Sequence, residues 1–395
     1  MEGLTADTAA CSISREEELH WLALTLIPGL GTRMAGKLLD RFRTPQAVFR
    51  ASRTELEAAG VGGAVAQSIS SGCSFEDALD QQRKMAERGA VAIVRGDPRY
   101  PALLREIFDP PVLLFARGRL ELLQPFHFAV VGTRRPTPYG LAAAERLSAD
   151  LARAGLTIVS GMARGIDTAA HKGAFSAGGD TVAVLGCGVD VVYPSENRKL
   201  AGDLAANGLL LSEFAMGSTA FPQNFPIRNR IISGLSAGVL VVEGAQYSGS
   251  AITAKLALDQ GRECFAVPGN ITSTASWGPN LLIKQGAKLV QDWNDVIVEL
   301  PAEVRRQLIE RGRTRLLGNT GASQDGGRTS HIEGSLPEVG RRLLAVLQVD
   351  TAIHLDDLLQ IVEDSSASEL IAALFELEML GLVKQLPGKH FVKVW

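Results

Sequence analysis

The 395-residue sequence has few cysteines, no long apolar run and little net charge, and each shortage excludes a class of protein. Its four cysteines show no Cys-x-x-Cys spacing, so we predict neither a zinc site nor a disulfide framework, and expect reduced thiols. No apolar run approaches the ~18 residues that a membrane span needs, and residues 1–14 show no signal-peptide pattern. We therefore expect a cytoplasmic protein with no membrane partner.

The charge balance also limits the kind of partner. Lys and Arg number 40 against 43 Asp and Glu, which gives a formal net charge of -3. A nucleic-acid site would therefore have to be a local basic patch.

Several signatures of cofactor and enzyme sites are missing as well. Gly186-Cys187-Gly188 lacks the third glycine of a dinucleotide fingerprint and is followed by Pro194. The sequence shows no metal-ligand cluster, and the Gly-x-Ser-x-Gly string at 234–238 precedes an apolar run rather than following one, so it is not a nucleophile elbow. His171 lies four residues after Asp167, where it suits a general base or a structural pair equally well. We expect no cofactor, no metal and no catalytic apparatus.

The ends of the chain differ in texture from its middle. We expect residues 1–15 to be disordered and residues 16–78 to form short helices, with Gly-punctuated turns in IPGLGTRMAGKLLDRF and AAGVGGAVAQSI. This is a helix-hairpin-helix or SAM-like pattern. Such turns can hold a DNA phosphate at a helix N-terminus, and a compact bundle whose glycines satisfy turn geometry explains them equally well.

Residues 79–300 alternate apolar runs with helical stretches. Each run is apolar at nearly every position, which is typical of strands covered on both faces, and most end in a small residue before a helix. The pattern predicts an α/β domain with a doubly wound sheet, whose ligands lie at the carboxyl ends of the strands. The runs are VAIV at 91, FAVVG at 128, LTIVSG at 156, TVAVLG at 181, LLLSE at 209, GVLVVEG at 238 and CFAVPG at 264.

The C-terminal part reads as a linker over 301–335 and a winged helix over 336–395. Three helices precede a hairpin around Pro387-Gly388, and Ser366 has capping-box spacing to Glu369. The third helix also carries Glu376 and Glu378 and has no cation before Lys384. This charge disfavours sequence-specific duplex binding and favours a protein-contact or accessory role.

Cations and small residues gather in the loops that follow the predicted strands. In FPIRNRIISG, Arg228 and Arg230 bracket Asn229 where a helix is predicted to begin, although two surface arginines with one internal salt bridge would look the same. SGSAIT at 248–253 offers a second cradle of N–H and hydroxyl donors. Several separate phosphate cradles suit a polymer backbone better than one nucleotide. Aromatic side chains available to stack on bases in the same loops are Tyr193, Phe221, Phe225 and Tyr247.

Six motifs in this order and spacing resemble the DNA-processing protein A family (DprA, also called Smf). They are VGTRRPTPYG, SGMARGIDTAAHKGA, LGCGVDVVYPSENRKL, LSEFAMG, FPIRNRIISGLS and SGSAITAKLALDQGRECFAVPGN. The resemblance implies an extended Rossmann-like sheet between a helix-hairpin-helix domain and a winged helix. It also implies a homodimer, without catalytic turnover, that binds and protects single-stranded DNA and loads a RecA-type recombinase during natural transformation.

The resemblance also assigns roles to residues. It implies phosphate contacts at Arg134, Arg164, Lys172, Arg228, Arg230 and Lys255. The neighbouring Asn229 belongs to the same site, and close backbone approach and donors come from Gly161, Ser248, Gly249 and Ser250. Asp167 and Glu213 are expected to order loops. One departure is Tyr247, which stands where family members often have a basic residue.

Two other functions remain in view. The first is a nucleotide-processing enzyme similar to the lysine-decarboxylase-like phosphoribohydrolases, but the Pro-Gly-Gly-x-Gly-Thr-x-x-Glu pattern of that group has no counterpart in EGAQYSGSAITAK. The second is a transcriptional regulator driven by the winged helix, which the acidic third helix disfavours.

Overall fold

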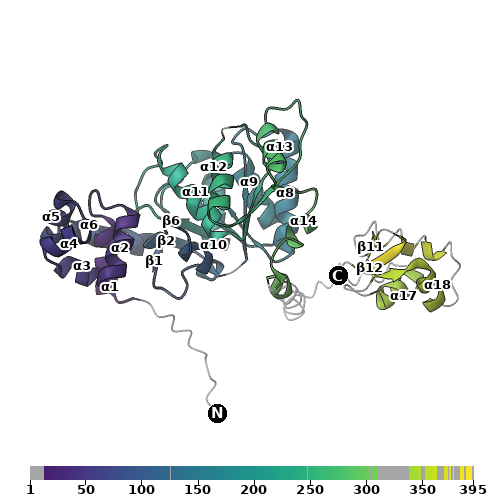
Figure 1. Cartoon of the computed structure of the whole chain (residues 1–395), viewed down its shortest axis with the longest axis horizontal. Coiled ribbons are helices and arrows are strands. Elements are labelled where there is room, and N and C mark those ends of the chain that lie inside the picture. The colour runs from purple at the N-terminus through teal and green to yellow at the C-terminus, as the bar shows by residue number, and fades with distance from the viewer. Residues whose placement is uncertain are drawn as a thin grey trace, which may run out of the picture. The chain divides into compact units, whose positions relative to one another are not determined.

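The computed structural model divides into two compact units, residues 1–313 and 314–395 (Figure 1). The residues that it describes are 13–124, 126–246, 248–302, 304–308, 338–347, 352–362, 369–371, 373–374, 377, 383–386 and 388–393.

The larger unit is built on a nine-stranded sheet of order β1-β2-β6-β5-β4-β3-β7-β8-β9. The strands from β3 to β9 pair in parallel, whereas β1 pairs with β2, and β2 with β6, in antiparallel fashion. This confirms the doubly wound α/β prediction and adds an antiparallel edge. The strands are β1 Val91–Val94, β2 Leu113–Gly118, β3 His127–Val131, β4 Thr157–Ser160, β5 Thr181–Leu185, β6 Leu209–Ser212, β7 Gly238–Val241, β8 Glu263–Ala266 and β9 Lys288–Leu289.

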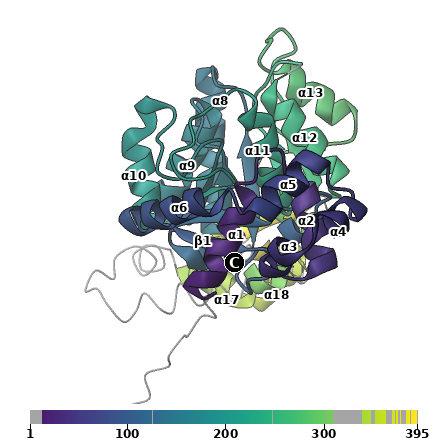
Figure 2. The same ribbon diagram turned by 90° about the vertical axis from the view of Figure 1, so that its left-hand side faces the viewer.

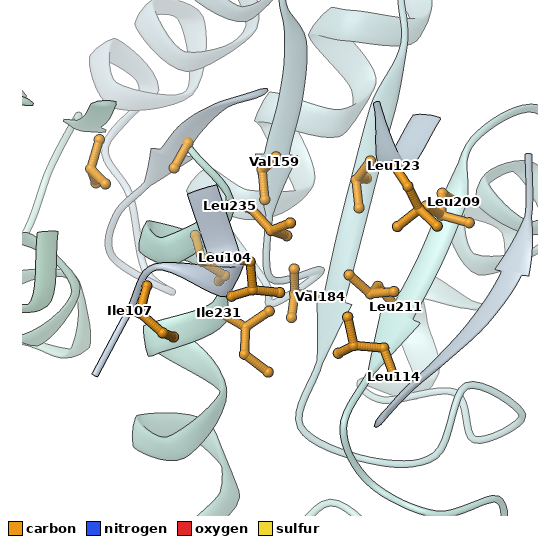
Figure 3. Close-up of a cluster of buried hydrophobic side chains, with 14 of the residues drawn as sticks. Leu104, Ile107, Leu114, Leu123, Val159, Val184, Leu209, Leu211, Ile231 and Leu235 are labelled. Carbon is orange, nitrogen blue, oxygen red and sulfur yellow. The ribbon is translucent and has the colours of Figure 1, made fainter. Parts of the chain in front are cut away.

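Helices cover both faces of this sheet, which is why its strands are apolar throughout. Within β3, Phe128 and Val130 enter the core beneath α8 and α9, and Ala129 and Val131 enter the core beneath α7, α11 and α12. Figure 3 shows the second core, where side chains of α7 and α11 meet those of β4, β5 and β6. The helical elements are α7 Ala102–Arg105, η1 Leu120–Leu123, α8 Pro138–Arg153, α9 Ile166–Ser176, η2 Ser195–Asn197, α10 Arg198–Asn207, α11 Asn224–Leu235, α12 Gly249–Asp259, α13 Trp277–Lys284 and α14 Asn294–Ile297.

Six N-terminal helices pack beside the antiparallel edge of the sheet (Figures 1 and 2). Ser14 caps the first helix in a capping box with Glu17. The predicted boundary at residue 78 falls inside α6, because this helix shares a core with the sheet through Ala78 and Met85. The helices are α1 Arg15–Thr25, α2 Thr32–Phe42, α3 Pro45–Arg50, α4 Arg53–Ala58, α5 Gly63–Ser71 and α6 Phe75–Arg88.

The start of the predicted linker includes a short helical segment. Residues 304–308 are helical, and Leu308 is buried in the core beneath α8. The linker prediction did not include this buried contact of Leu308. Residues 309–335 of the predicted linker lie outside the described residues, as do residues 1–12 of the predicted disordered N-terminus.

The smaller unit carries α17 Glu338–Val346, α18 Leu355–Ile361 and a three-stranded antiparallel sheet. The strands are β10 Ile353–His354, β11 Val383–Leu386 and β12 His390–Lys393, and the last two form the predicted hairpin. In the third predicted helix Glu369 is exposed, whereas Ser366, Glu376 and Glu378 lie outside the described residues.

Candidate nucleic-acid interface

The order in which the chain adds strands to the sheet reverses between β3 and β7. The chain runs outward from β3 through β4, β5 and β6, and then returns to continue on the other side through β7, β8 and β9. Ligands of such sheets lie beyond the carboxyl ends of the strands at this switch point. The loops at these carboxyl ends cover residues 132–137, 161–165, 186–194 and 242–246.

A carboxylate of the protein itself fills one anion position at the switch point. Glu243 accepts hydrogen bonds from the Thr137 backbone N–H at 2.9 Å and from the Thr137 hydroxyl at 2.5 Å, at the N-terminus of α8. Gly140 leaves room for it, because a Cβ there would lie 2.2 Å from the Glu243 Oε2 atom. A pyrophosphate would normally use this helix end, and the buried carboxylate would repel it. A phosphate group would therefore have to bind elsewhere along these strand ends.

A pocket opens between the loops after β4 and β5 and the first turn of α11. Its enclosed volume is about 30 Å³, and about 400 Å³ when the open solvent at its mouth is included. One wall is aromatic: the rings of Tyr193 and Phe225 lie 5.6 Å apart, and the guanidinium carbon of Arg134 lies 4.8 Å from the centre of the Phe225 ring. The lining residues are Arg134, Gly161, Ala163, Arg164, Leu185, Gly186, Cys187, Tyr193, Pro194 and Phe225.

Arg228 lies beneath this pocket rather than on the surface. Its side chain is 3% exposed, and its Nη1 atom donates to the Val184 carbonyl at 2.6 Å. The guanidinium lies against the Cα of Gly161, where an added Cβ would be 1.8 Å from Nη1. Because the helix begins at Asn224, Arg228 falls in its second turn and turns inward. In this position Arg228 supports the floor of the pocket, and its predicted phosphate contact stays a prediction.

The charge of Arg228 acts on its buried neighbours. Burial raises the pKa of Asp167, and the adjacent positive charge of Arg228 lowers it in part. The same carboxylate accepts from the Ala163 backbone N–H at 3.3 Å, so it orders the loop after β4 as expected. Burial lowers the pKa of Arg228, although a guanidinium stays protonated near neutral pH.

Arg230 and Asn229 also contact protein groups. Arg230 is 6% exposed and forms ion pairs with Asp109 at 3.0 Å and with Glu213 at 2.7 Å. Two carboxylates thus hold this buried guanidinium, and the predicted phosphate contact at Arg230 stays a prediction. The amide of Asn229 donates to the Gly249 carbonyl at 3.3 Å and ties α11 to the start of α12.

The other predicted cations remain at the surface. Arg134 is exposed beside the pocket, and Arg164 is exposed and paired with Glu196 of η2. Lys172 is exposed on α9, and Lys255 is exposed on α12. These four side chains are accessible to a polyanion.

The Ser248–Ser250 cradle is formed mainly by groups of the protein itself. The Ser248 hydroxyl accepts from the Ala251 backbone N–H at 3.3 Å and lies 2.8 Å from the Ser250 hydroxyl. Ser250 is buried, whereas Gly249 is exposed, and a Cβ added to Gly249 would meet no atom within 4 Å among the described residues. Gly249 therefore permits close approach from solvent. Tyr247 lies outside the described residues.

His171, which was considered as a general base, lies inside the fold. His171 is fully buried, its Nδ1 atom lies 2.7 Å from the Thr181 hydroxyl, and burial lowers its pKa to about 3. His171 therefore bonds to Thr181 of β5, a residue that the sequence spacing did not identify as its partner. Its complete burial argues against the general-base interpretation. Burial also raises the pKa of the Cys187 thiol to about 11, which disfavours a nucleophilic thiolate.

Sequence reasoning missed the protein partners of the buried cations. Asp109 lies more than 100 positions from Arg230 along the chain, so no local pattern could connect them. Two further carboxylates of the site, Glu196 and Glu243, could have been suspected from their positions. Glu196 lies in the cation-rich loop after β5, and Glu243 follows an apolar strand run. Among the described residues, no group of three or more His, Cys, Asp or Glu side chains could hold a metal ion, and no helix is long and apolar enough to cross a membrane.

Comparison with known proteins agrees with this architecture. The sequence pattern of the family described as DNA recombination-mediator protein A matches residues 91–301. The Smf protein of Synechocystis is 33% identical over 96% of this chain and 99% of its own length. The chain belongs to the DprA family. This confirms the resemblance seen in the six sequence motifs.

Further matches place the flanking domains within the DprA architecture. A SAM-like helix-hairpin-helix tandem matches residues 22–74, and the DprA winged-helix domain matches residues 332–389. The DprA protein of Bacillus subtilis is 45% identical over 54% of this chain and 73% of its own length. The crystal structure of Streptococcus pneumoniae DprA aligns with a TM-score of 0.63 and 35% identity over 73% of this chain and 99% of that one.

Proposed function

We propose that this chain binds single-stranded DNA without sequence preference, at the pocket beside β4 and β5. The observation that carries the proposal is the aromatic wall of Phe225 and Tyr193 with the guanidinium of Arg134 stacked on it. Every base can stack on such aromatic rings, because every base has a π-face. A base that is paired within a duplex cannot reach them, so this wall favours single strands. Arg134, Arg164, Lys172 and Lys255 are exposed cations that would contact phosphates of the bound strand.

The role that we infer for this binding is recombination mediation, in line with the description of the family. The bound strand would be protected and passed to a RecA-type recombinase during natural transformation, by a homodimer in the cytoplasm and without chemical turnover. Burial of His171 and of the Cys187 thiol supports a binding protein over an enzyme.

The test is fluorescence anisotropy of labelled oligo-dT and of a duplex of equal length, at several salt concentrations. We expect tighter binding of the single strand with a steep salt dependence. Arg134→Ala should weaken binding of all single-strand sequences alike and reduce the log–log salt slope by about 0.7, the value for one phosphate contact. Arg146→Ala, which removes an exposed cation in the middle of α8, is the matched control and should bind normally.

Two results would overturn the proposal. The first is negligible binding of oligo-dT by the unaltered chain, and the second is a loss in Arg134→Ala that depends on base sequence while the salt slope stays unchanged. Release of free base from a nucleoside monophosphate would support the phosphoribohydrolase alternative.

A further inference from the structure

The six N-terminal helices, residues 15–88, form the helical domain. Its last helix, α6, contacts a loop of the sheet through one side chain. Gln81 is 6% exposed, and its amide makes two hydrogen bonds with the backbone of Met216. The Gln81 Oε1 atom accepts from the Met216 N–H at 2.7 Å, and the Gln81 Nε2 atom donates to the Met216 carbonyl at 3.3 Å. A primary amide offers one acceptor and two donors, so it can satisfy both polar groups of a single residue.

A second helix of the same domain reaches the same loop. Thr32, the first residue of α2, donates its hydroxyl to the Glu213 Oε1 atom at 2.8 Å. Glu213 also holds Arg230, so one carboxylate joins α2 to α11. The first Gly-punctuated turn of the helical domain thus already has an acidic partner within the protein at its helix N-terminus, where a carboxylate is favourable.

The same loop continues to the wall of the pocket. The Gly217 N–H donates to Asp190 at 2.9 Å, and the Gly188 N–H donates to the Ser218 carbonyl at 3.0 Å. At the start of α11, the Asn224 amide donates to the Gly186 carbonyl at 3.0 Å. Gly186 lines the pocket, so a continuous set of contacts joins α6 to the pocket wall.

Apolar packing follows the same route. Ala78 and Met85 of α6 share one buried cluster with Met216, Val189 and Cys187, the last of which lines the pocket. Displacement of α6 from the loop would therefore disturb both the hydrogen bonds and the packing behind the pocket wall, because close-packed interiors transmit strain.

We propose that Gln81 and Thr32 are positioning residues that hold the loop over 213–218 in place and so set the affinity of the pocket for single-stranded DNA. The helical domain then acts as a support for the pocket, and its first hairpin turn serves this contact rather than a DNA phosphate. The inference rests on the proposed function for its effect on binding, and on the structure alone for the contact itself.

The decisive comparison is between two neighbouring glutamines of α6. Gln81→Met removes both hydrogen bonds to Met216 and keeps the size of the side chain. Gln82→Met is the matched control. Gln82 is 7% exposed, and among the described residues its amide bonds to α1, to the Arg15 carbonyl at 2.8 Å and to Glu18 at 2.9 Å. Thr32→Val tests the second contact if Gln81→Met does not fold.

Two readouts are measured on the full chain: oligo-dT anisotropy, and backbone amide hydrogen exchange of the segment 213–218. Gln81→Met should bind oligo-dT about three- to tenfold more weakly, the scale of one hydrogen bond, and should exchange faster in this segment. Gln82→Met should match the unaltered chain in both readouts, and Thr32→Val should resemble Gln81→Met.

The inference is overturned if Gln81→Met and Thr32→Val bind oligo-dT normally, or if Gln82→Met loses as much affinity as they do. Unchanged exchange over 213–218 in Gln81→Met would also refute it. If the unaltered chain does not bind oligo-dT, the proposed function fails, and the exchange experiment still decides whether Gln81 holds the loop.

Discussion

Gly161→Ala tests whether the floor of the pocket rests on the buried guanidinium of Arg228. The new methyl carbon would lie 1.8 Å from Nη1, 2.5 Å from Cζ and 2.6 Å from Nη2, so the guanidinium has to move. Movement would break the bond from Nη1 to the Val184 carbonyl, a bond to a charged group that contributes about 1.5–3 kcal/mol. Overpacking adds about 1–3 kcal/mol. We therefore expect a loss of about 2.5–6 kcal/mol in the free energy of unfolding.

The measurement is denaturant unfolding of the full chain, followed by a probe of the α/β unit. Gly249→Ala is the matched control from the same predicted site: it adds the same methyl group at the exposed start of α12, where no described atom lies within 4 Å. We expect no loss there and a gain of up to about 1 kcal/mol, because alanine lowers the entropy of the unfolded chain.

A double variant separates the clash from other effects. In Arg228→Ala the obstructing group is gone, so adding Gly161→Ala should cost nothing further, although the single changes are each destabilising. The reasoning is refuted if Gly161→Ala unfolds like the unaltered chain, or if its loss adds in full to that of Arg228→Ala.

Three further predictions concern the pocket and its surroundings. Phe225→Leu should remove the stacking surface and weaken oligo-dT binding by about 1–3 kcal/mol with little change in salt slope; normal affinity would exclude stacking on this ring. Glu196→Gln should release Arg164 from its surface ion pair and tighten oligo-dT binding about two- to fivefold at low salt only, and a gain that persists at high salt would contradict this account. Because burial lowers the pKa of His171 to about 3 from an ordinary value near 6.5, acidification through this interval protonates the unfolded chain first and lowers the free energy of unfolding. His171→Gln should flatten that pH dependence in denaturant unfolding at about pH 4 to 7, and an unchanged dependence would assign it to other groups.

The sheet could be predicted because its strands are apolar on both faces. Phe128 and Val130 enter one core while Ala129 and Val131 enter the other, and this pattern is visible as a continuous apolar run. The two-residue strand β9 was missed because it is too short to show periodicity, and β2 was not among the predicted apolar runs.

The loops of the site could be located for the same reason, since each follows a recognisable strand. The residue types in them indicated an anion partner, and Arg134, Arg164, Lys172 and Lys255 are indeed exposed. These conclusions follow from local sequence, because a residue that directly follows a buried parallel strand lies at its carboxyl end whatever surrounds it.

Which cations reach solvent was decided only by the tertiary structure. In the sequence Arg228 and Arg230, like Arg134, are cations of a loop region that follows a predicted strand. In the structure Arg228 is buried against the Val184 carbonyl, and Arg230 is buried against Glu213 and Asp109. The contact between Gln81 and Met216 likewise joins residues 135 positions apart. The sequence by itself determined the elements and the chemistry of the loops, through short-range pattern. Pairing and burial depend on contacts between segments that are distant along the chain, and only the folded chain brings those segments together.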